Sequence, residues 1–109
     1  MGLINVETGC VASFYGAARM QHGGITLIAH SGSVFTTLAM NDPRYQFDLL
    51  VSPGQEIGAT VDEYIDFALG RSTTKVIAVF MESARNPDGF KTSLLRARNA
   101  NVPVVVCKV

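Results

Sequence analysis

The sequence lacks several features that mark specialised classes of protein. It has no tryptophan and only two cysteines, Cys10 and Cys107, which form no Cys-x-x-Cys pair. Two cysteines so far apart do not build a disulfide framework, so we expect free thiols in a reducing, cytoplasmic setting, and we predict no metal site. Cys107 lies in the apolar run Val104–Cys107, where a thiol packs as a small hydrophobic group, and it is expected to be buried and unreactive.

An excess of charge of one sign is also missing, because nine basic residues balance nine acidic ones. No block of lysine and arginine interleaved with aromatic residues occurs, which argues against nucleic acid as a partner. The charge is nevertheless uneven along the chain, with most acids in residues 42–66 and most bases in residues 71–109. We expect two oppositely charged helix faces that contact solvent.

Long apolar runs are absent as well. No run approaches the ~20 residues that span a bilayer, and residues 1–20 lack the basic-then-apolar order of a signal peptide, so no membrane partner is expected. With 109 residues, of which 48% are hydrophobic, the chain fits one domain with a substantial core. We interpret residues 1–23, with Val11–Tyr15 as a short strand candidate, as a lead-in arm from a preceding domain and residues 24–109 as the domain itself.

Four apolar segments are predicted to be strands, because short apolar runs bounded by turn residues are typical of buried strands. They are Ile25–His30, Phe47–Val51, Lys75–Met81 and Val102–Val109. The last of these resembles a central strand in composition, yet the chain stops there with no covering element. We therefore expect the chain to be a C-terminally truncated piece of a longer protein.

Three helices are predicted between these strands. The first runs from Gly32 to about Met40 and ends before Pro43. The second follows the capping box Thr60–Glu63 and ends at Gly70. The third begins at Asn86 and Pro87, which have the form of an N-cap and a first helical residue.

Alternation of strands and helices predicts an α/β fold with three layers, in which a parallel sheet of about four strands has helices on both faces. Ligands of such sheets bind beyond the carboxyl ends of the strands. A helix N-terminus at that edge has free N–H groups and suits a phosphate or carboxylate group. The candidate site residues at this edge are Ser31, Gly32 and Ser33, the wall residues Ser52, Gly54, Gln55 and Glu56, and Glu82.

Seven motifs resemble, in order, the second domain of NDP-forming acyl-CoA synthetases, which are relatives of succinyl-CoA synthetase. The motifs are Gly2-Leu-Ile-Asn, Ile25-Thr-Leu-Ile-Ala-His-Ser-Gly, Ser52-Pro-Gly-Gln-Glu, Asp62-Glu-Tyr-Ile, Val76-Ile-Ala-Val-Phe-Met-Glu, Asn86-Pro-Asp-Gly-Phe and Pro103-Val-Val-Val-Cys-Lys. Each motif alone is weak, but their shared order and spacing are fairly specific. The resemblance covers essentially the whole chain.

This resemblance implies a flavodoxin-like fold and a part in joining a carboxylic acid to CoA at the expense of ATP or GTP with Mg²⁺. The reaction passes through an acyl phosphate and a phosphorylated histidine. Ser31 and Gly32 would begin a helix that faces the phosphohistidine, and Glu82 would orient its imidazole as a catalytic residue. The implied partners are CoA-binding and ATP-grasp domains or subunits, so this chain alone is expected to bind no cofactor.

The sequence departs from the family at three site positions. The family usually has Gln, Gly and Asn where this chain has His30, Ser33 and Gln55. The family's phosphorylated histidine follows the fourth strand in a Ser-His-Thr-Gly loop, and neither His22 nor His30 matches it. A non-catalytic, ligand-sensing or interaction domain of the same ancestry is therefore the alternative hypothesis.

Each site residue also has a purely structural interpretation. Ser31 and Gly32 can form an N-cap that binds nothing, and His30 can be a core or turn histidine. Glu82 can cap a loop or pair with Arg85. The acyl substrate, the nucleotide and the oligomeric state are left open by the sequence.

Overall fold

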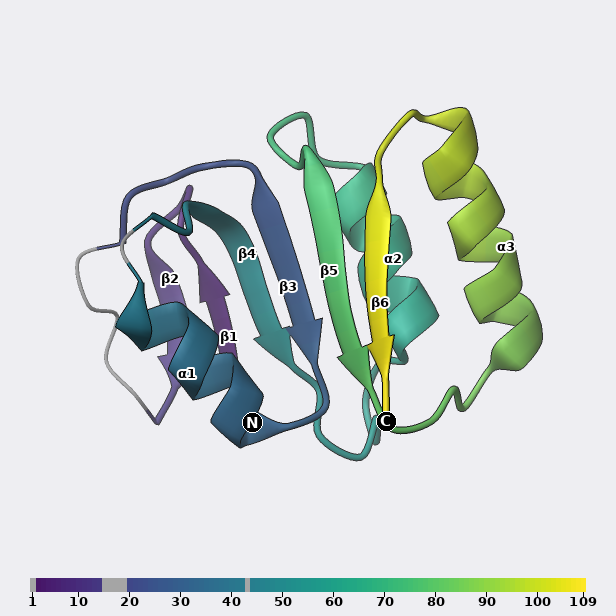
Figure 1. Ribbon diagram of the computed structural model, residues 1–109, viewed down its shortest axis with the longest axis horizontal. Coiled ribbons are helices and arrows are strands. Elements are labelled where there is room, and N and C mark those ends of the chain that lie inside the picture. The colour runs from purple at the N-terminus through teal and green to yellow at the C-terminus, as the bar shows by residue number, and fades with distance from the viewer. Residues whose placement is uncertain (1, 15–19, 43) are drawn as a thin grey trace.

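The computed structural model describes residues 2–14, 20–42 and 44–109, which form a sheet of six strands and three helices (Figure 1). The strand order is β2-β1-β4-β3-β5-β6. The strands are β1 Gly2–Asn5, β2 Cys10–Ser13, β3 Ile25–Ala29, β4 Phe47–Ser52, β5 Val76–Met81 and β6 Val104–Lys108, and the helices are α1 Gly32–Asn41, α2 Val61–Leu69 and α3 Pro87–Asn99. No helix in these residues is long and apolar enough to cross a membrane.

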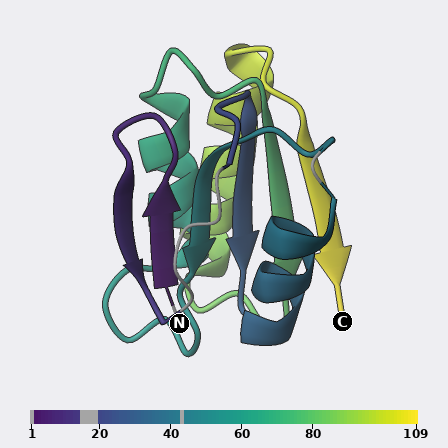
Figure 2. The same cartoon turned by 90° about the vertical axis from the view of Figure 1, so that its left-hand side faces the viewer.

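The four strands predicted from the sequence are all present and pair in parallel, which confirms the flavodoxin-like α/β fold. β3 lies at the centre, between β4 and β5, and its side chains divide between two cores. Leu27 and Ala29 pack in the core that contains Phe35 of α1, whereas Ile28 packs against α2. Figure 2 shows the resulting layers, with α1 on one face of the sheet and α2 and α3 on the other.

Local signals placed the three helix starts correctly. The Ser31 hydroxyl caps α1 by accepting a hydrogen bond from the Val34 N–H at 3.3 Å. The capping box of Thr60 and Glu63 is present at the start of α2, and Asn86 caps α3 just before Pro87. These contacts satisfy N–H groups that the first turn of a helix leaves unpaired.

The sheet is larger than the predicted four strands, because residues before Gly23 contribute an antiparallel hairpin. β1 pairs with β2 and also with β4, and Ile4 is buried in the core on the α1 side. The four-residue strands of this hairpin are too short to show a clear alternation of apolar and polar residues, and pairing with the open edge of β4 stabilises them. The predicted strand Val11–Tyr15 is observed as Cys10–Ser13, and Tyr15 lies outside the described residues.

The prediction that Cys107 is buried was wrong. Both cysteines are free and exposed. Cys107 lies in β6, which is an edge strand rather than a central one, and most residues of β6 are exposed. An apolar run of this kind indicates a strand but does not tell whether both faces of that strand are covered.

The predicted charge imbalance appears at the contact between α2 and α3. Arg96 of α3 forms an ion pair with Asp66 of α2, and the Ser93 hydroxyl donates to the same carboxylate at 2.8 Å. At the start of α3, the Asn86 side chain donates to Asp62 at 3.0 Å. These polar contacts join α3 to α2.

A buried carboxylate, Asp48, joins four segments at the amino ends of the parallel strands. Asp48 has no exposed surface. Its two oxygens accept hydrogen bonds from Arg71 at 2.9 and 2.6 Å, and it contacts Thr74 at 3.0 Å and His22 at 3.2 Å. Arg71 also reaches Glu7 after β1, at 2.9 Å. The network therefore ties the N-terminal hairpin to the core, and sequence reasoning did not identify it.

We expect acid to destabilise the fold through Asp48. Burial alone would raise the pKa of Asp48, but hydrogen bonds from Arg71, Thr74 and His22 outweigh burial and lower this pKa from 3.8 to about 2. A lowered native pKa means that the stabilisation is complete above pH 4 and is lost as the pH falls through about 2, a change of about 2 kcal/mol in the free energy of unfolding. Urea unfolding across this range measures it. An Asp48→Asn variant should show a shallower pH dependence, and an equal slope would contradict the assignment.

Candidate functional site

The N-terminus of α1 lies at the carboxyl edge of the sheet, directly after β3. Ser31 has extended backbone angles, and its side chain accepts from Val34. Gly32 and Ser33 are exposed, and none of the described residues accepts a hydrogen bond from their N–H groups. The first turn contains no acidic residue. Two free N–H groups and the positive end of the helix dipole therefore face solvent here.

His30, the last residue before this turn, connects two other strand ends. Its side chain is 6% exposed. The Glu82 N–H, directly after β5, donates to His30 Nδ1 at 3.2 Å. On the other side of the ring, Nε2 lies 3.0 Å from Oε1 of Glu56. The angle of this contact is outside the hydrogen-bond range, so Nε2 has no hydrogen-bond partner among the described residues.

Glu56 belongs to the loop between β4 and α2, and its side chain turns inward. The residue is 5% exposed and has a φ of 53°, in the left-handed region. Its Oε2 accepts a hydrogen bond from the Val61 N–H at 2.9 Å, at the start of α2. Glu56 thus supplies the negative charge that a helix N-terminus favours. The positive end of α2 is already occupied by the protein itself.

The structure brings together part of the predicted site. His30 links Glu56 and Glu82 directly beside Ser31, as the rule for parallel sheets predicted. Gln55 is exposed, whereas Ser52 is buried with a hydroxyl that has no hydrogen-bond partner among the described residues. Gly54 has a φ of 62°, which the turn before Glu56 requires.

The Glu82 side chain is exposed and forms no ion pair with Arg85 among the described residues. A carboxylate at this place is free to accept a hydrogen bond from an incoming group. Sequence reasoning missed the bridging contacts of His30 and the inward orientation of Glu56. The sequence did indicate that His30 and Glu56 follow adjacent strands, and this could have predicted that they lie close together.

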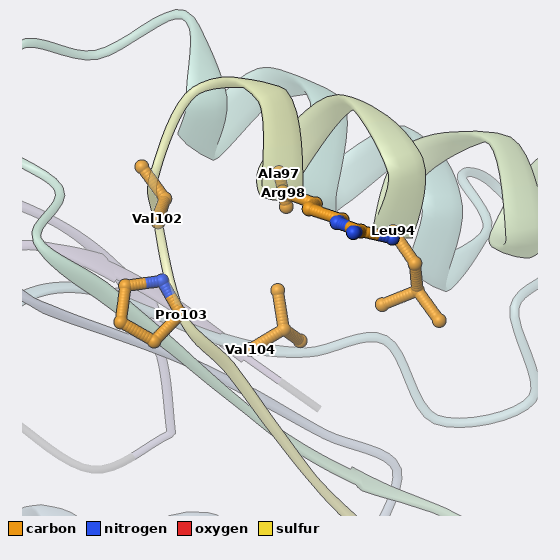
Figure 3. Close-up of a pocket in the computed structure, with 6 residues that line it drawn as sticks. All are labelled: Leu94, Ala97, Arg98, Val102, Pro103 and Val104. Carbon is orange, nitrogen blue, oxygen red and sulfur yellow. The ribbon is translucent and has the colours of Figure 1, made fainter.

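No group of three or more His, Cys, Asp or Glu side chains that could hold a metal ion occurs in residues 2–14, 20–42 and 44–109. A groove of about 310 Å³ lies elsewhere, between α3 and the start of β6 (Figure 3). It is lined by Leu94, Ala97, Arg98, Val102, Pro103 and Val104. Because it lies near the amino end of β6, it is separate from the site at the carboxyl edge.

Comparison with protein families identifies related proteins. Residues 22–109 match the family described as the succinyl-CoA ligase like flavodoxin domain. An ADP-forming acetate–CoA ligase from Archaeoglobus fulgidus is 33% identical over 98% of this chain, which corresponds to 16% of the ligase. A trans-feruloyl-CoA synthase from an unidentified prokaryote is 36% identical over 51% of this chain and 8% of its own length.

Solved structures share the fold. An acetyl-coenzyme A synthetase from Candidatus Korarchaeum cryptofilum, described as dinucleotide forming, superposes with a TM-score of 0.87 at 20% identity, over 98% of this chain and 24% of its own. A protein from Pyrococcus horikoshii gives 0.87 at 19% identity, with the same coverage of both chains. The Korarchaeum enzyme in complex with phosphate and ADP gives 0.84. The chain therefore spans a minor part of the proteins that it matches.

Proposed function

We propose, because the chain belongs to the family of succinyl-CoA ligase like flavodoxin domains, that it is the phosphate-facing domain of an NDP-forming acyl-CoA synthetase. Such an enzyme joins a carboxylic acid to CoA and converts a nucleoside triphosphate to the diphosphate and phosphate. The observation that carries the proposal is the start of α1, where Gly32 and Ser33 present free N–H groups at the carboxyl edge. A phosphoryl group fits such a helix terminus.

Two comparisons support this function. The curated relative at 33% identity is an ADP-forming acetate–CoA ligase. One structure with the same fold was determined with phosphate and ADP bound. Since this chain corresponds to 16% of the acetate–CoA ligase, CoA-binding and ATP-grasp domains or subunits would provide the rest of the reaction.

The three helices that begin at the carboxyl edge differ in the number of acidic groups at their first turn. α2 begins with Asp62 and Glu63 and holds the Glu56 carboxylate, and α3 has Asp88 in its first turn. α1 has no acid in its first turn. Acidic groups at a helix start repel a second anion, so α1 is the helix to which phosphate would bind.

Individual residues receive distinct roles in this proposal. The hydroxyl of Ser33 and the N–H groups of Gly32 and Ser33 would bind the phosphoryl group. Glu82, exposed at the end of β5, would accept a hydrogen bond from the imidazole of a phosphohistidine supplied by another segment and so fix which ring nitrogen reacts. The wall residue Glu56 would act through its contacts with His30 and α2.

Phosphate titration monitored by NMR tests the site in the isolated chain. Inorganic phosphate should shift the amide signals of Gly32 and Ser33 in a saturable manner, while sodium chloride at equal ionic strength should not. The amides of Asp62 and Glu63 at the start of α2 serve as an internal control and should stay fixed. Unmoved signals at α1, or equal shifts at both helices, would overturn the proposed site and favour a non-catalytic domain.

A further inference from the structure

His30 is a buried, titratable residue beside the proposed site to which that function assigns no role. We propose that His30 is a positioning residue whose neutral ring forms a bridge: Nδ1 accepts a hydrogen bond from the Glu82 N–H, a protonated Nε2 lies in electrostatic contact with Glu56, and the shape of the α1 turn is thereby fixed. The bridge is inferred from the contacts of the His30 ring alone. The effect of the bridge on phosphate binding rests on the proposed function.

The position of the proton follows from what faces each ring nitrogen. The Glu82 N–H points at Nδ1, so Nδ1 must offer a lone pair. Nε2 lies 3.0 Å from a Glu56 oxygen, and a nearby carboxylate favours a proton there. Among the described residues, no other charged side chain forms an ion pair or hydrogen bond with the ring. Both contacts therefore select the same neutral tautomer.

The bridge links three segments that are far apart in sequence. His30 ends β3, Glu56 precedes α2, and Glu82 follows β5. The backbone is joined here as well, since the His30 N–H donates to the Phe80 carbonyl at 3.0 Å. Ser31, the N-cap of α1, is the next residue, so the contacts of His30 hold the segment that leads into the α1 turn.

The same contacts make His30 a poor phosphoryl acceptor. Its side chain is 6% exposed, its Nδ1 lone pair is used by Glu82, and a carboxylate lies against Nε2. Attack by either nitrogen would require displacing one of these partners. A neutral side chain with one acceptor and one donor is sufficient for the bridge. The amide of glutamine has both groups.

NMR of the full chain tests the bridge without any ligand. Nitrogen shifts of the ring at about pH 8 should report the Nε2–H tautomer, and the Glu82 amide should exchange slowly, as a hydrogen-bonded group does. In His30→Gln that amide should stay bonded, because the glutamine amide also offers an acceptor. In His30→Leu its hydrogen exchange should accelerate by about tenfold, the value of one hydrogen bond. His22→Gln, at the opposite edge of the sheet, is the matched control and should leave Glu82 unchanged.

Phosphate affinity then separates the two proposals. His30→Gln should bind phosphate as the natural chain does, whereas His30→Leu, which cannot form the bridge, should bind it more weakly. An Nδ1–H tautomer, or a Glu82 amide whose exchange does not respond to His30→Leu, overturns the bridge whatever phosphate does. A correct tautomer with no phosphate binding in any variant leaves the bridge intact but refutes both the proposed function and the role of the bridge in it.

Discussion

Replacing Arg71 with methionine is expected to lower the free energy of unfolding by about 3 kcal/mol, the largest loss of stability that we predict. Arg71 binds the Asp48 carboxylate through two nitrogens, and Asp48 has no exposed surface. The methionine keeps much of the apolar stem of the arginine but leaves the carboxylate without its cation. Removing the partner of a buried charge lowers the free energy of unfolding by far more than a surface ion pair contributes to it.

Urea unfolding of paired variants measures this effect. Arg44→Met is the matched control, because Arg44 is 87% exposed and its ion pair with Asp42 lies in solvent, where such pairs contribute little to stability. Adding Asp48→Asn to Arg71→Met should restore part of the loss, since no buried charge then remains. Equal effects of the two arginine variants would show that Asp48 does not need Arg71.

Replacing Ser33 with aspartate is expected to abolish measurable phosphate binding, a loss of about tenfold or more, while leaving the fold intact. Ser33 is the second residue of α1, and a carboxylate there would repel a phosphate dianion directly. The same carboxylate should stabilise the fold by about 0.5 kcal/mol, because it interacts favourably with the helix dipole. Weaker phosphate binding together with higher stability would identify the start of α1 as a ligand site. A purely structural cap would show the change in stability alone.

Phosphate titration and thermal unfolding of Ser33→Asp provide the two measurements. Thr37→Asp is the matched control, since Thr37 is exposed on the same helix but lies beyond the first turn. It should keep phosphate binding within about twofold, because the dipole effect falls off after the first turn. If both variants bind equally well, the N-terminus of α1 is not the binding site.

The elements that the sequence predicted well are those with local causes. Thr60 and Glu63 form their capping box within four residues, and Asn86 with Pro87 begins α3 in the same way. The apolar run of β3 requires burial on both faces, which places it at the centre of a parallel sheet. Such signals need no knowledge of distant segments.

The features that the sequence did not reveal depend on distant contacts. β1 is stable because it pairs with β4, some 45 residues later. Asp48 is a charged residue in a buried strand, and its charge is stabilised by the ion pair with Arg71, which lies in a distant part of the sequence. At the site, the turn at Ser31 was located correctly, but the direction of the Glu56 side chain depends on its left-handed backbone and on the Val61 N–H. Strand ends can be aligned by topology, whereas side-chain directions at those ends cannot.

The carboxylate of Glu56 at the start of α2 has a consequence for how many ligands this edge can hold. Two of the three helix poles at the edge carry the chain's own acidic groups, and α1 alone among the described helices lacks them. The acidic groups at α2 and α3 disfavour a second anion at those helix starts. Under the proposed function we therefore expect one anion per domain, even when phosphate is abundant.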